Sequence, residues 1–523
     1  MQAREQLAAA LHILRRLHAE GYEAYLAGGC VRDLLLGREP LDYDVATSAT
    51  PDVVLQMFPR TFAVGAHFGV VLVSTCDAAG EESIMTEVAT FRSDGVYSDG
   101  RHPDAVHYTL SAEDDVQRRD FTINGLLLDP LRGGGGLGHV LRGGEALRQG
   151  EQPTNPLRGG GTLELFLQDE AALRQGEQLE ALAGSPEALR AAVIDHVGGL
   201  VDLDAGMVRA IGNPAARFEE DHLRMLRAVR FAARYGFSLD PATEHAIRGL
   251  APRMAAVSRE RVRDELTKML TEGHARRAFE LLHATGLLAQ VLPEVAKLVG
   301  VEQPPQFHPE GDVWQHVLLV LDQLEAGCSM TLGWGALLHD IGKPATFKRA
   351  TDRIRFDGHV EVGVAIATDV CRRFRFSNEE TRQTLALVEN HMRLMEVQRM
   401  KDATLKRMFR LEGFAEHLAL HRMDCMASKG DLENWTYARR RWQETPAEAV
   451  RPTPLLTGHE LIAAGYVPGA RFRAMLEAVE EAQLEGTITS AAEALALVEM
   501  RFGPAGWSGT AGKKRTENCR IRQ

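Results

Sequence analysis

The sequence predicts an α+β protein, in which a small head built on a mixed sheet precedes an all-α body. Residues 22–92 alternate short apolar runs with turn residues, and one stretch among them, Pro51 to Phe58, has helical spacing. Beyond residue 213 the apolar residues recur mainly at helical spacing. A length of 523 residues with 45% apolar side chains allows three or more domains with separate cores. The predicted strands of the head are Tyr25 to Ala27, Tyr43 to Ala46, Phe62 to Val64, Gly69 to Thr75 and Ile84 to Phe91.

Composition narrows the functional class. Six cysteines are scattered without the spacing of disulfide or metal sites, which favours a reducing cytoplasm. The N-terminal stretch Ala3 to Glu20 is a charged helical pattern, and we find neither a signal peptide nor an apolar run that could span a membrane. The net charge of −12 argues against an indiscriminate nucleic-acid binder, although a local basic face is compatible with RNA. We expect a cytoplasmic protein with no membrane partner.

The first candidate site is a glycine corner in the sequence LAGGCVRDLLLG. A predicted strand runs into Gly28 and Gly29 and then into a short helical pattern. Glycines let the backbone approach an anion, and the N–H groups of the first helical turn face it. Arg32 lies one turn into the helix and adds a full positive charge. The corner therefore predicts phosphate binding.

Carboxylates follow this corner in the sequence LDYDVAT. Asp42 and Asp44 flank Tyr43 in a predicted strand, so alternation along the strand places both carboxylates on one face. No neighbouring cation pairs them, and Mg²⁺ prefers carboxylate oxygens together with substrate phosphates, as nucleotidyl transfer with two ions requires. Glu87 on the last predicted strand is a candidate third carboxylate, although a solvated strand glutamate explains it equally well.

Two further motifs carry charged residues suited to nucleotides. In RRDFTIN, Arg118 and Arg119 offer forked donors for a triphosphate, and Asp120 can accept from a ribose hydroxyl. The sequence RFEEDHLRMLRAVRFAARYGF at residues 217–237 predicts one long helix. This helix carries charged residues at three-residue steps: Asp221, Arg224, Arg227 and Arg230.

The strings GGCVRDLLLG, LDYDVAT, RRDFTIN and EEDHLR, in this order, resemble the signature of the template-independent nucleotidyltransferases. That family comprises bacterial tRNA CCA-adding enzymes, their CC- and A-adding relatives, and bacterial poly(A) polymerases. The resemblance implies addition of CMP and AMP to the 3′ end of tRNA, from CTP and ATP, with Mg²⁺ in the head. It also implies that the polar loop from Ser93 to Val106 is mobile and helps the enzyme to change nucleotide.

The same resemblance implies roles for single residues. Asp42 and Asp44 would bind Mg²⁺ and activate the terminal 3′-hydroxyl for in-line attack on the α-phosphate. Asp221 and Arg224 would hydrogen-bond the Watson–Crick edge of the base, because a carboxylate accepts from the exocyclic amine that ATP and CTP share. The nucleotide-binding set is Gly28, Gly29, Arg32, Arg119, Asp120, Asp221, Arg224, Arg227 and Arg230.

A second set of candidate residues follows Pro304. The adjacent pair His339-Asp340 in LLHDIGKP lets an imidazole and a carboxylate converge on one ion. The order H…HD…H…H…D resembles HD-type metal-dependent phosphohydrolases, in the form with ligands for two metals. The resemblance implies phosphatase or cyclic phosphodiesterase activity with Ni²⁺, Co²⁺, Mn²⁺ or Mg²⁺, and Lys343 could bind phosphate. The predicted ligands are His316, His339, Asp340, His359, His391 and Asp424.

The remaining segments complete the expected organisation. Residues 129–154 and 155–180 are a tandem duplication, because they align without a gap and share PLRGGG and ALRQGEQ; we interpret the surrounding segment as a flexible insertion. Arg259, Arg261 and Arg263 are interpreted as surface residues of a neck helix. We expect a head at 1–130, a Gly-rich insertion at 131–191, the end of the head at 192–212, a base-reading and RNA-binding neck at 213–295, an HD domain at 296–430, a helical tail at 431–506 and a disordered basic end at 507–523.

Three alternatives stay open at the level of sequence. An A-adding enzyme or a poly(A) polymerase would share every motif of the head. A phosphohydrolase regulated by a nucleotide-binding head is a second alternative, against which the intact pair Asp42 and Asp44 counts. A pure RNA-binding scaffold is the third, and the acidic net charge disfavours it.

Overall fold

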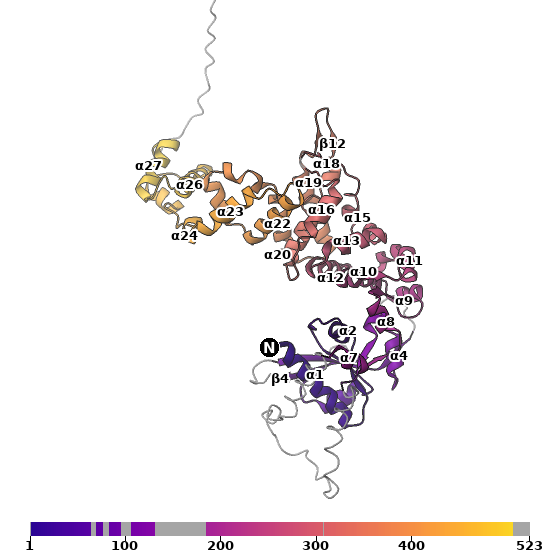
Figure 1. The fold of residues 1–523 in the computed structure, drawn as a ribbon. Coiled ribbons are helices and arrows are strands. Elements are labelled where there is room, and N and C mark those ends of the chain that lie inside the picture. The colour runs from indigo at the N-terminus through magenta and orange to yellow at the C-terminus, as the bar shows by residue number, and fades with distance from the viewer. Residues whose placement is uncertain are drawn as a thin grey trace, which may run out of the picture. The chain divides into compact units, whose positions relative to one another are not determined.

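The computed structural model describes residues 2–63, 69–76, 83–95, 106–130, 185–306 and 308–505. The chain divides into two compact units, which we describe separately (Figure 1). The first unit is Met1–Lys297 with Leu324–Cys328 and Arg373–Arg375. The second unit is Leu298–Gln323, Ser329–Arg372 and Phe376–Gln523.

A mixed sheet forms the centre of the head. Within the described residues it has seven strands, in the order β3-β4-β5-β2-β1-β8-β9. Strands β2 and β5 are parallel, and the other neighbours are antiparallel. The strands are β1 (Ala24–Ala27), β2 (Asp44–Thr47), β3 (Thr61–Phe62), β4 (Val70–Cys76), β5 (Ser83–Thr90), β8 (Leu126–Leu128) and β9 (Val193–Asp195). A helical body follows this sheet, which confirms the predicted α+β class.

Short helices cover and connect the sheet. Helix α1 (Gln2–Ala19) packs on it through Ile13, Leu14 and Leu17, which share one helical face and are fully buried. The other helices of the head are α2 (Gly29–Leu35), α3 (Pro51–Met57), α4 (Ala112–Gln117), the 3₁₀ turn η2 (Thr122–Asn124), α7 (Pro186–Ala191) and α8 (Gly199–Asp204). Two small strand pairs are β6 (Arg92–Asp94) with β7 (Val106–Tyr108), and β10 (Met207–Val208) with β11 (Ser238–Leu239).

The predicted insertion begins and ends at a strand pair. Leu128 on β8 lies opposite Val193 on β9, so the segment between them leaves and rejoins the sheet at one edge. Residues 131–184 lie outside the described residues, as do residues 96–105 of the predicted loop and the predicted disordered end at 507–523. Residues 186–191 at the end of the predicted insertion form α7, whose Leu189 is buried.

The neck of the first unit is helical. It contains α9 (Pro214–Glu220), α10 (Leu223–Tyr235), α11 (Pro241–Leu250), η5 (Ala251–Ala256), α12 (Arg259–Thr271), α13 (Ala275–Ala284), α14 (Leu287–Val291) and α15 (Pro293–Ala296). The prediction of one helix over 217–237 was wrong. The chain turns at Asp221, with φ −148° and ψ 104°, because its Oδ1 accepts the N–H of Leu223 at 3.0 Å and starts a new helix there.

The second unit is built almost wholly from helices. They are α16 (Val313–Leu321), α17 (Met330–Leu338), α18 (Lys343–Thr346), α19 (His359–Arg373), α20 (Asn378–Asn390), η6 (Arg393–Arg399), α21 (Asp402–Phe409), α22 (Phe414–Ala427), α23 (Glu433–Glu444), α24 (Ala447–Val450), α25 (Gly458–Ala463), α26 (Ala470–Leu484) and α27 (Ala491–Phe502). A hairpin of β12 (Lys348–Arg349) and β13 (Ile354–Arg355) projects beside α18 (Figure 1).

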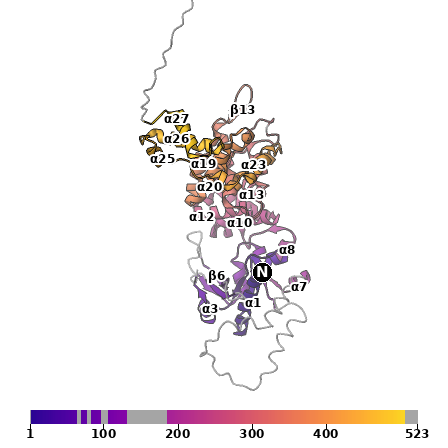
Figure 2. The same cartoon turned by 90° about the vertical axis from the view of Figure 1, so that its left-hand side faces the viewer.

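The last three helices form a small core of their own. Leu461, Met475, Val479 and Val498 are buried together, and α25, α26 and α27 gather around them (Figure 2). Pro468 and Gly469 lie in the turn between α25 and α26. Among the described residues, no helix combines the length and the apolar character that crossing a membrane requires.

Candidate functional site

A cavity of about 500 Å³ in the first unit collects most of the predicted nucleotide-binding residues. Arginines from α2, α10, α12 and the segment after α4 line it, together with Asp44 of β2. Forked guanidinium groups from several elements suit the oxygens of a triphosphate. The predicted residues in its wall are Gly28, Gly29, Arg32, Asp44, Arg119, Asp120, Asp221, Arg224 and Arg227.

The glycine corner forms one wall of this cavity. Gly28 has φ +75°, and a Cβ on it would lie 2.9 Å from Nη1 of Arg119. Arg32 is buried; its Nε donates to Asp33 at 2.9 Å, and its Nη1 donates to Asn124. The guanidinium of Arg32 also lies 4.6 Å from the ring centre of Tyr235. Glycine at position 28 thus leaves room for Arg119, and Arg32 is held in place by protein partners.

Ion pairs with carboxylates hold the charged side chains of the RRDFTIN segment in place. Asp115 accepts from Arg118 at 2.7 Å and from Arg119 at 3.2 Å. Asp120 accepts from Arg227 at 2.7 Å. Burial acts to raise the pKa of Asp120, but Arg227 and the Asn124 amide outweigh it and lower this pKa to about 2. Asp120 therefore fixes Arg227 in the cavity wall, and the ribose contact predicted for Asp120 stays a prediction.

Three carboxylates converge at the start of β2. Asp44 precedes Val45, Glu87 precedes Val88, and these valines are neighbours on parallel strands. The pKa of Asp44 is raised to about 7, first by burial and then by the charges of Asp42 and Glu87, against the opposing charge of Arg119. Carboxylates held this close suit a divalent cation, so the residues fit the Mg²⁺ that the head implies. Asp42 is exposed and lies before β2, so its predicted place inside the strand was wrong.

The predicted base-reading pair meets a residue that the sequence did not single out. Asp221 accepts from Arg261 of α12 at 2.7 Å and 3.1 Å, and Arg261 lines the cavity. The interpretation of Arg261 as a surface residue was therefore wrong. Its spacing along α12 carried no signal, because the partner lies 40 residues earlier in the chain. Arg224 donates to Glu220 at 2.6 Å.

Arg230 lies apart from the cavity. Its Nε donates to Glu265 of α12 at 2.7 Å, and the residue is only 5% exposed. Each step of three residues turns the side chain by roughly 60° around a helix, so Arg230 faces the packed side of α10 and Arg227 faces the cavity. The structure places Arg230 in a buried ion pair between two helices, and its predicted nucleotide contact is corrected accordingly.

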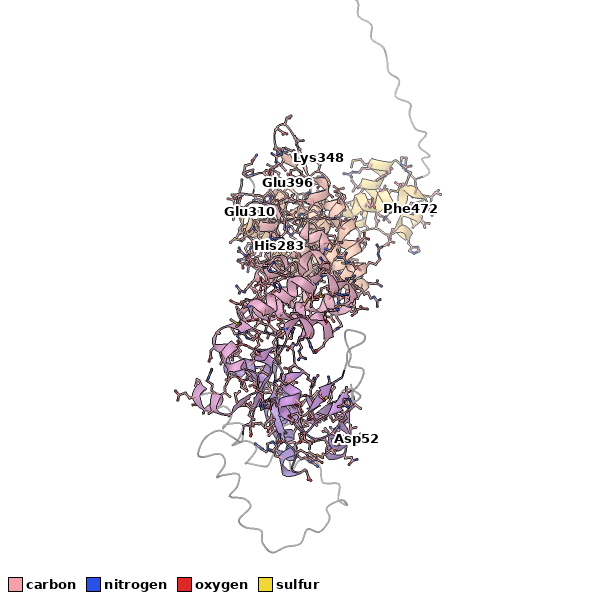
Figure 3. The ribbon with its side chains drawn as sticks, turned by 90° about the vertical axis from the view of Figure 1, so that its right-hand side faces the viewer. Asp52, His283, Glu310, Lys348, Glu396 and Phe472 are labelled. Atoms are coloured by element: carbon pink, nitrogen blue, oxygen red, sulfur yellow. The ribbon has the colours of Figure 1, made fainter. Side chains whose placement is uncertain are left out.

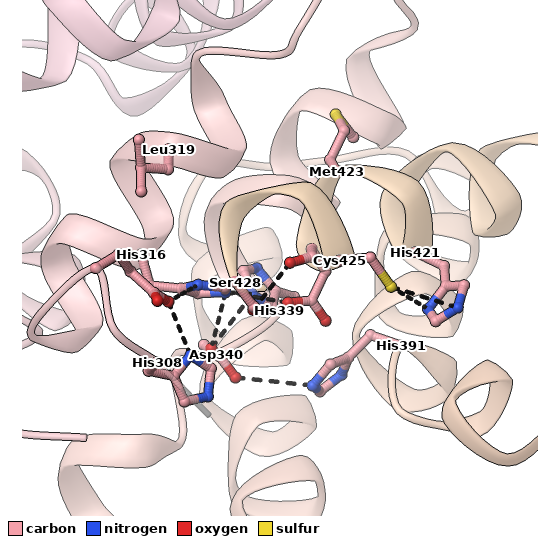
Figure 4. Close-up of polar contacts among 12 residues, drawn as sticks. His308, His316, Leu319, His339, Asp340, His391, His421, Met423, Cys425 and Ser428 are labelled. Carbon is pink, nitrogen blue, oxygen red and sulfur yellow. Dashed lines mark hydrogen bonds and ion pairs between the residues drawn. The ribbon is translucent and has the colours of Figure 1, made fainter. Parts of the chain in front are cut away.

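In the second unit all six predicted metal ligands come together. Figure 4 labels four of them, His316, His339, Asp340 and His391. The six ligands stand on α16, α19 and α22 and at the ends of α17 and α20. Two groups, each within 4.8 Å, are His316 with His339 and Asp424, and Asp340 with His359 and His391. Oδ1 of Asp340 lies 3.7 Å from His391, and its Oδ2 lies 3.3 Å from His339. Asp340 therefore connects the two groups.

The four histidines are oriented in the same way. Nδ1 of His339, His359 and His391 lies within 2.7–3.0 Å of a backbone carbonyl oxygen, to which it donates. Nδ1 of His316 lies 2.8 Å from a carboxylate oxygen of Glu310. With Nδ1 committed, Nε2 is left to bind an ion. The donor set of four imidazoles and two carboxylates fits one or two divalent metals.

Glu310 and Lys343 support this cluster. Glu310, labelled in Figure 3, also accepts from His308 at 2.8 Å. It lies between His308 and His316 in the sequence and was not among the predicted residues. Nζ of Lys343 lies 2.7 Å from Asp340. Burial acts to raise the pKa of Asp340, but Lys343, His339 and His316 hold it well below the ordinary value. The carboxylate is thus kept ionised, as metal binding requires.

Family comparisons agree with this geometry. The sequence matches the poly(A) polymerase head domain over residues 24–151, the "Probable RNA and SrmB- binding site of polymerase A" over 236–298, and the HD domain over 313–422. The CCA-adding enzyme of Geobacillus thermodenitrificans is 36% identical over 55% of this chain and 55% of its own length. That of Lactobacillus gasseri is 33% identical over 61% of this chain and 64% of its own length. The matches thus span between half and two thirds of these relatives.

A solved structure matches more of the chain. The Bacillus stearothermophilus CCA-adding enzyme in complex with CTP has a TM-score of 0.63 and 25% identity, over 94% of this chain and 96% of that one. The fold, the order of the three domains and the sequence matches confirm the predicted resemblance. The fold and the sequence matches make the chain similar to the template-independent nucleotidyltransferases that include the CCA-adding enzymes, with a segment at 313–422 that matches the HD domain.

Proposed function

We propose that the first unit adds CMP and AMP to the 3′ end of tRNA, using CTP and ATP as substrates. One observation carries this proposal. The glycine corner, the arginines, Asp44 and the pair Asp221 and Arg224 line a single cavity of about 500 Å³. Phosphate donors, metal-binding carboxylates and base-edge partners are the three requirements of template-independent nucleotide addition.

The proposed reaction uses the residues of the cavity as follows. The terminal 3′-hydroxyl oxygen bonds to the α-phosphorus, the bond from that phosphorus to the bridging oxygen breaks, pyrophosphate leaves and the hydroxyl proton passes to water. Arg119 and Arg32 position the triphosphate against the glycine corner. Mg²⁺ held by Asp42, Asp44 and Glu87 would supply Lewis-acid stabilisation of the charge on the phosphates.

Base selection is assigned to Asp221 and Arg224. A carboxylate accepts from the exocyclic amine of adenine or cytosine, and a guanidinium donates to the adjacent ring nitrogen. Guanine and uracil present a carbonyl oxygen where the other two bases present the amine, so they would face the carboxylate with an acceptor. The described contacts of Asp221 use its Oδ1 twice and its Oδ2 once, so an acceptor position on Oδ2 is available.

A set of tRNA substrates tests the head. Transcripts that end before CCA, after C and after CC are incubated with each nucleoside triphosphate separately, and the products are sized. We expect CMP on the first two and AMP on the third. AMP addition alone would identify an A-adding enzyme, and a long A tract a poly(A) polymerase. If none of the transcripts is extended, the proposal is contradicted.

Asp221→Ala should lose the preference for CTP over UTP, whereas unchanged selectivity would exclude the base-reading role.

We also propose a metal-dependent phosphohydrolase activity for the second unit, on the strength of its histidine–aspartate cluster. A water oxygen would bond to phosphorus, the phosphorus–oxygen bond of the ester would break, and the alcohol would leave with a proton. The six ligands would hold Ni²⁺, Co²⁺, Mn²⁺ or Mg²⁺, which supplies an activated water. Trimming of damaged RNA 3′ ends is the role that would serve the head.

Hydrolysis of phosphate esters tests this second activity, read as ring opening to adenosine monophosphate for the cyclic ester and as phosphate release for the aryl ester. Protein loaded with each metal in turn is offered 2′,3′-cyclic AMP and an aryl phosphate, and we expect hydrolysis that His339→Ala removes. Equal hydrolysis by the variant would assign the activity to a contaminant. If only this activity is found and no tRNA is extended, the head is a regulator and the phosphohydrolase is the main function.

The proposed function also includes the domain limits and the cytoplasmic location that were predicted from the sequence.

A further inference from the structure

A second cavity, of about 610 Å³, opens from the histidine–aspartate cluster of the second unit. Asp340, His359 and Asp424 reach one end of it, together with Lys343. Away from the cluster, the lining includes apolar side chains as well as charged ones. The apolar residues are Ile354 of β13, Phe356 after it, Met392 just before η6 and Met395 within η6. The cavity thus joins a charged end that suits a phosphate to an apolar wall.

We propose that this cavity binds one nucleoside phosphate, with the phosphate at the cluster and the base against Phe356 and Met395. The inference rests on the proposed phosphohydrolase activity, and it adds a base-binding site and two residues that determine specificity. The ligand class is a 3′-nucleotide, either free or as the last residue of an RNA.

The size of the cavity supports a single nucleotide. Sites for small molecules and cofactors have volumes of roughly 300–1,000 Å³, so about 610 Å³ accommodates a base, a ribose and a phosphate. A double-helical acceptor stem is far wider than a cavity of this volume and would not enter. An RNA could therefore present only its terminal nucleotide to the cluster.

The apolar wall suits a nucleobase. Met392 and Met395 are each 44% exposed and both line the cavity, so their side chains are open to a ligand there. Aromatic rings and thioethers both pack well on the flat face of a base, with little preference among bases. The side chain of Asn434 holds this wall in place, because its Nδ2 donates to the carbonyl oxygen of Met395 at 2.7 Å.

Phe356 links the wall to the charged end. Its carbonyl oxygen accepts from Nδ1 of His359 at 3.0 Å, and Nζ of Lys343 lies 5.4 Å from its ring centre. Lys343 also contacts Asp340 at 2.7 Å. A base stacked on this ring would place its ribose phosphate beside Lys343 and the cluster. Replacing the side chain leaves the carbonyl that orients His359, so the wall can be tested without removing a ligand of the cluster.

The test compares a phosphate ester that has a base with one that lacks it. The probes are guanosine 3′-monophosphate and glycerol 2-phosphate, both secondary monoesters, and guanine is chosen because the head is proposed to select adenine and cytosine. We expect Phe356→Ala to raise the KM for the guanosine ester about tenfold without changing kcat, and to leave glycerol 2-phosphate unaffected. Met395→Ala should act in the same direction. The control is Phe347→Ala, whose ring lies 6.0 Å from Phe356 but does not line the cavity.

A binding measurement separates this inference from the proposed activity. Equilibrium dialysis of guanosine 3′-monophosphate against chelator-treated full-length protein should show saturable binding that Phe356→Ala weakens and Phe356→Leu largely restores. Binding without hydrolysis by the parent protein would refute the phosphohydrolase and retain the base site. If Phe356→Ala raised the KM for both esters equally, or changed neither KM, the base site would be overturned. A lower KM for a short RNA ending in a 3′-phosphate than for the free nucleotide would identify RNA ends as the ligand.

Discussion

At the scale of single residues, Arg261 controls the orientation of the predicted base-reading carboxylate. Its two terminal nitrogens bind both oxygens of Asp221, at 3.1 Å and 2.7 Å. A bidentate guanidinium–carboxylate pair fixes the plane of the carboxylate as well as its position. The carboxylate proposed to select the base is thus held by the neck helix α12, although the sequence motif that contains Asp221 lies just before α10.

Arg261→Ala should relax nucleotide selection. Without this pair the carboxylate of Asp221 can rotate, so we expect the preference for CTP over UTP to fall about tenfold, which corresponds to about 1.4 kcal/mol. The measurement is the ratio of kcat/KM values for the two nucleotides. Arg263→Ala, on the same helix and paired with Asp264, is the control. An equal change in both variants would mean that the helix, rather than the pair, is responsible.

Gly28→Ala should weaken triphosphate binding. A methyl group would lie 2.9 Å from Nη1 of Arg119, so this guanidinium must move. Gly37→Ala is a matched control, because Gly37 has φ +67° and open space around its Cβ position. Both variants should lose roughly 1–2 kcal/mol of stability from the left-handed backbone. We expect only Gly28→Ala to raise the KM for CTP; equal KM values in the two variants would contradict the argument.

His417 should make the second unit less stable in mild acid. It is 4% exposed, its Nε2 has no hydrogen-bond partner among the described residues, and burial lowers its pKa from 6.5 to about 4. The unfolded chain takes up a proton below pH 6.5 and the folded one does not until about pH 4. Stability is therefore complete above pH 6.5 and is lost as the pH falls toward 4, by about 3 kcal/mol in total.

Denaturant unfolding at several pH values checks this sign. His417→Phe should reduce the loss of unfolding free energy between pH 6.5 and 4, while the exposed His459→Phe should leave the loss unchanged. A parent protein whose stability is constant over this range would exclude the effect. His417 packs on the ring of Phe414 at 6.4 Å, so the aromatic replacement preserves the contact.

At the scale of elements, local sequence predicted five of the seven described strands of the head sheet, but not where every element begins and ends. Apolar alternation predicted β4 and β5, because this signal is local. The break between α9 and α10 was not predicted from the sequence, because EEDHLRML has continuous helical spacing. The break depends on the hydrogen bond from the N–H of Leu223 to the carboxylate of Asp221. Asp42 likewise lies outside β2, because β2 starts only where β1 provides a partner.

The two candidate sites differ in how far the sequence predicts them. The six predicted ligands of the second unit could be named from the sequence, because the adjacent pair His339-Asp340 and the ordered histidines form a distinctive pattern; the structure brings these residues together. Arg261 and Glu310 were missed, because each acts through a residue distant in sequence or ordinary in type. Arg230 was included only for its spacing, whereas its partner is Glu265. Motifs thus name the groups that touch a substrate more readily than the groups that hold them.

At the scale of the whole molecule, the division into two compact units predicts separate responses to ligands. Ni²⁺ added to chelator-treated protein should stabilise the second unit selectively, because the cluster with four histidines lies there and imidazoles suit Ni²⁺ better than the carboxylates of the head do. At a metal concentration of a hundred times the Kd the gain is about 2.7 kcal/mol. Calorimetry should show one transition moving to higher temperature while the other stays in place.

Two variants make this prediction specific. His339→Ala should abolish the shift, because its Nε2 lies 3.3 Å from that of His316 inside the cluster. His459→Ala, an exposed histidine of the same unit, should leave the shift intact. A shift of equal size in His339→Ala would locate the stabilising metal elsewhere in the chain.

The pairing of Leu128 with Val193 has a practical consequence for protein engineering. Hydrogen bonds between β8 and β9 hold both ends of the intervening chain at neighbouring positions. The two attachment points of a domain inserted between these strands would therefore lie as close together as two paired strands. A fluorescent reporter or an affinity domain whose own termini are adjacent could be inserted there, and the chain would continue into β9 without a change to the sheet.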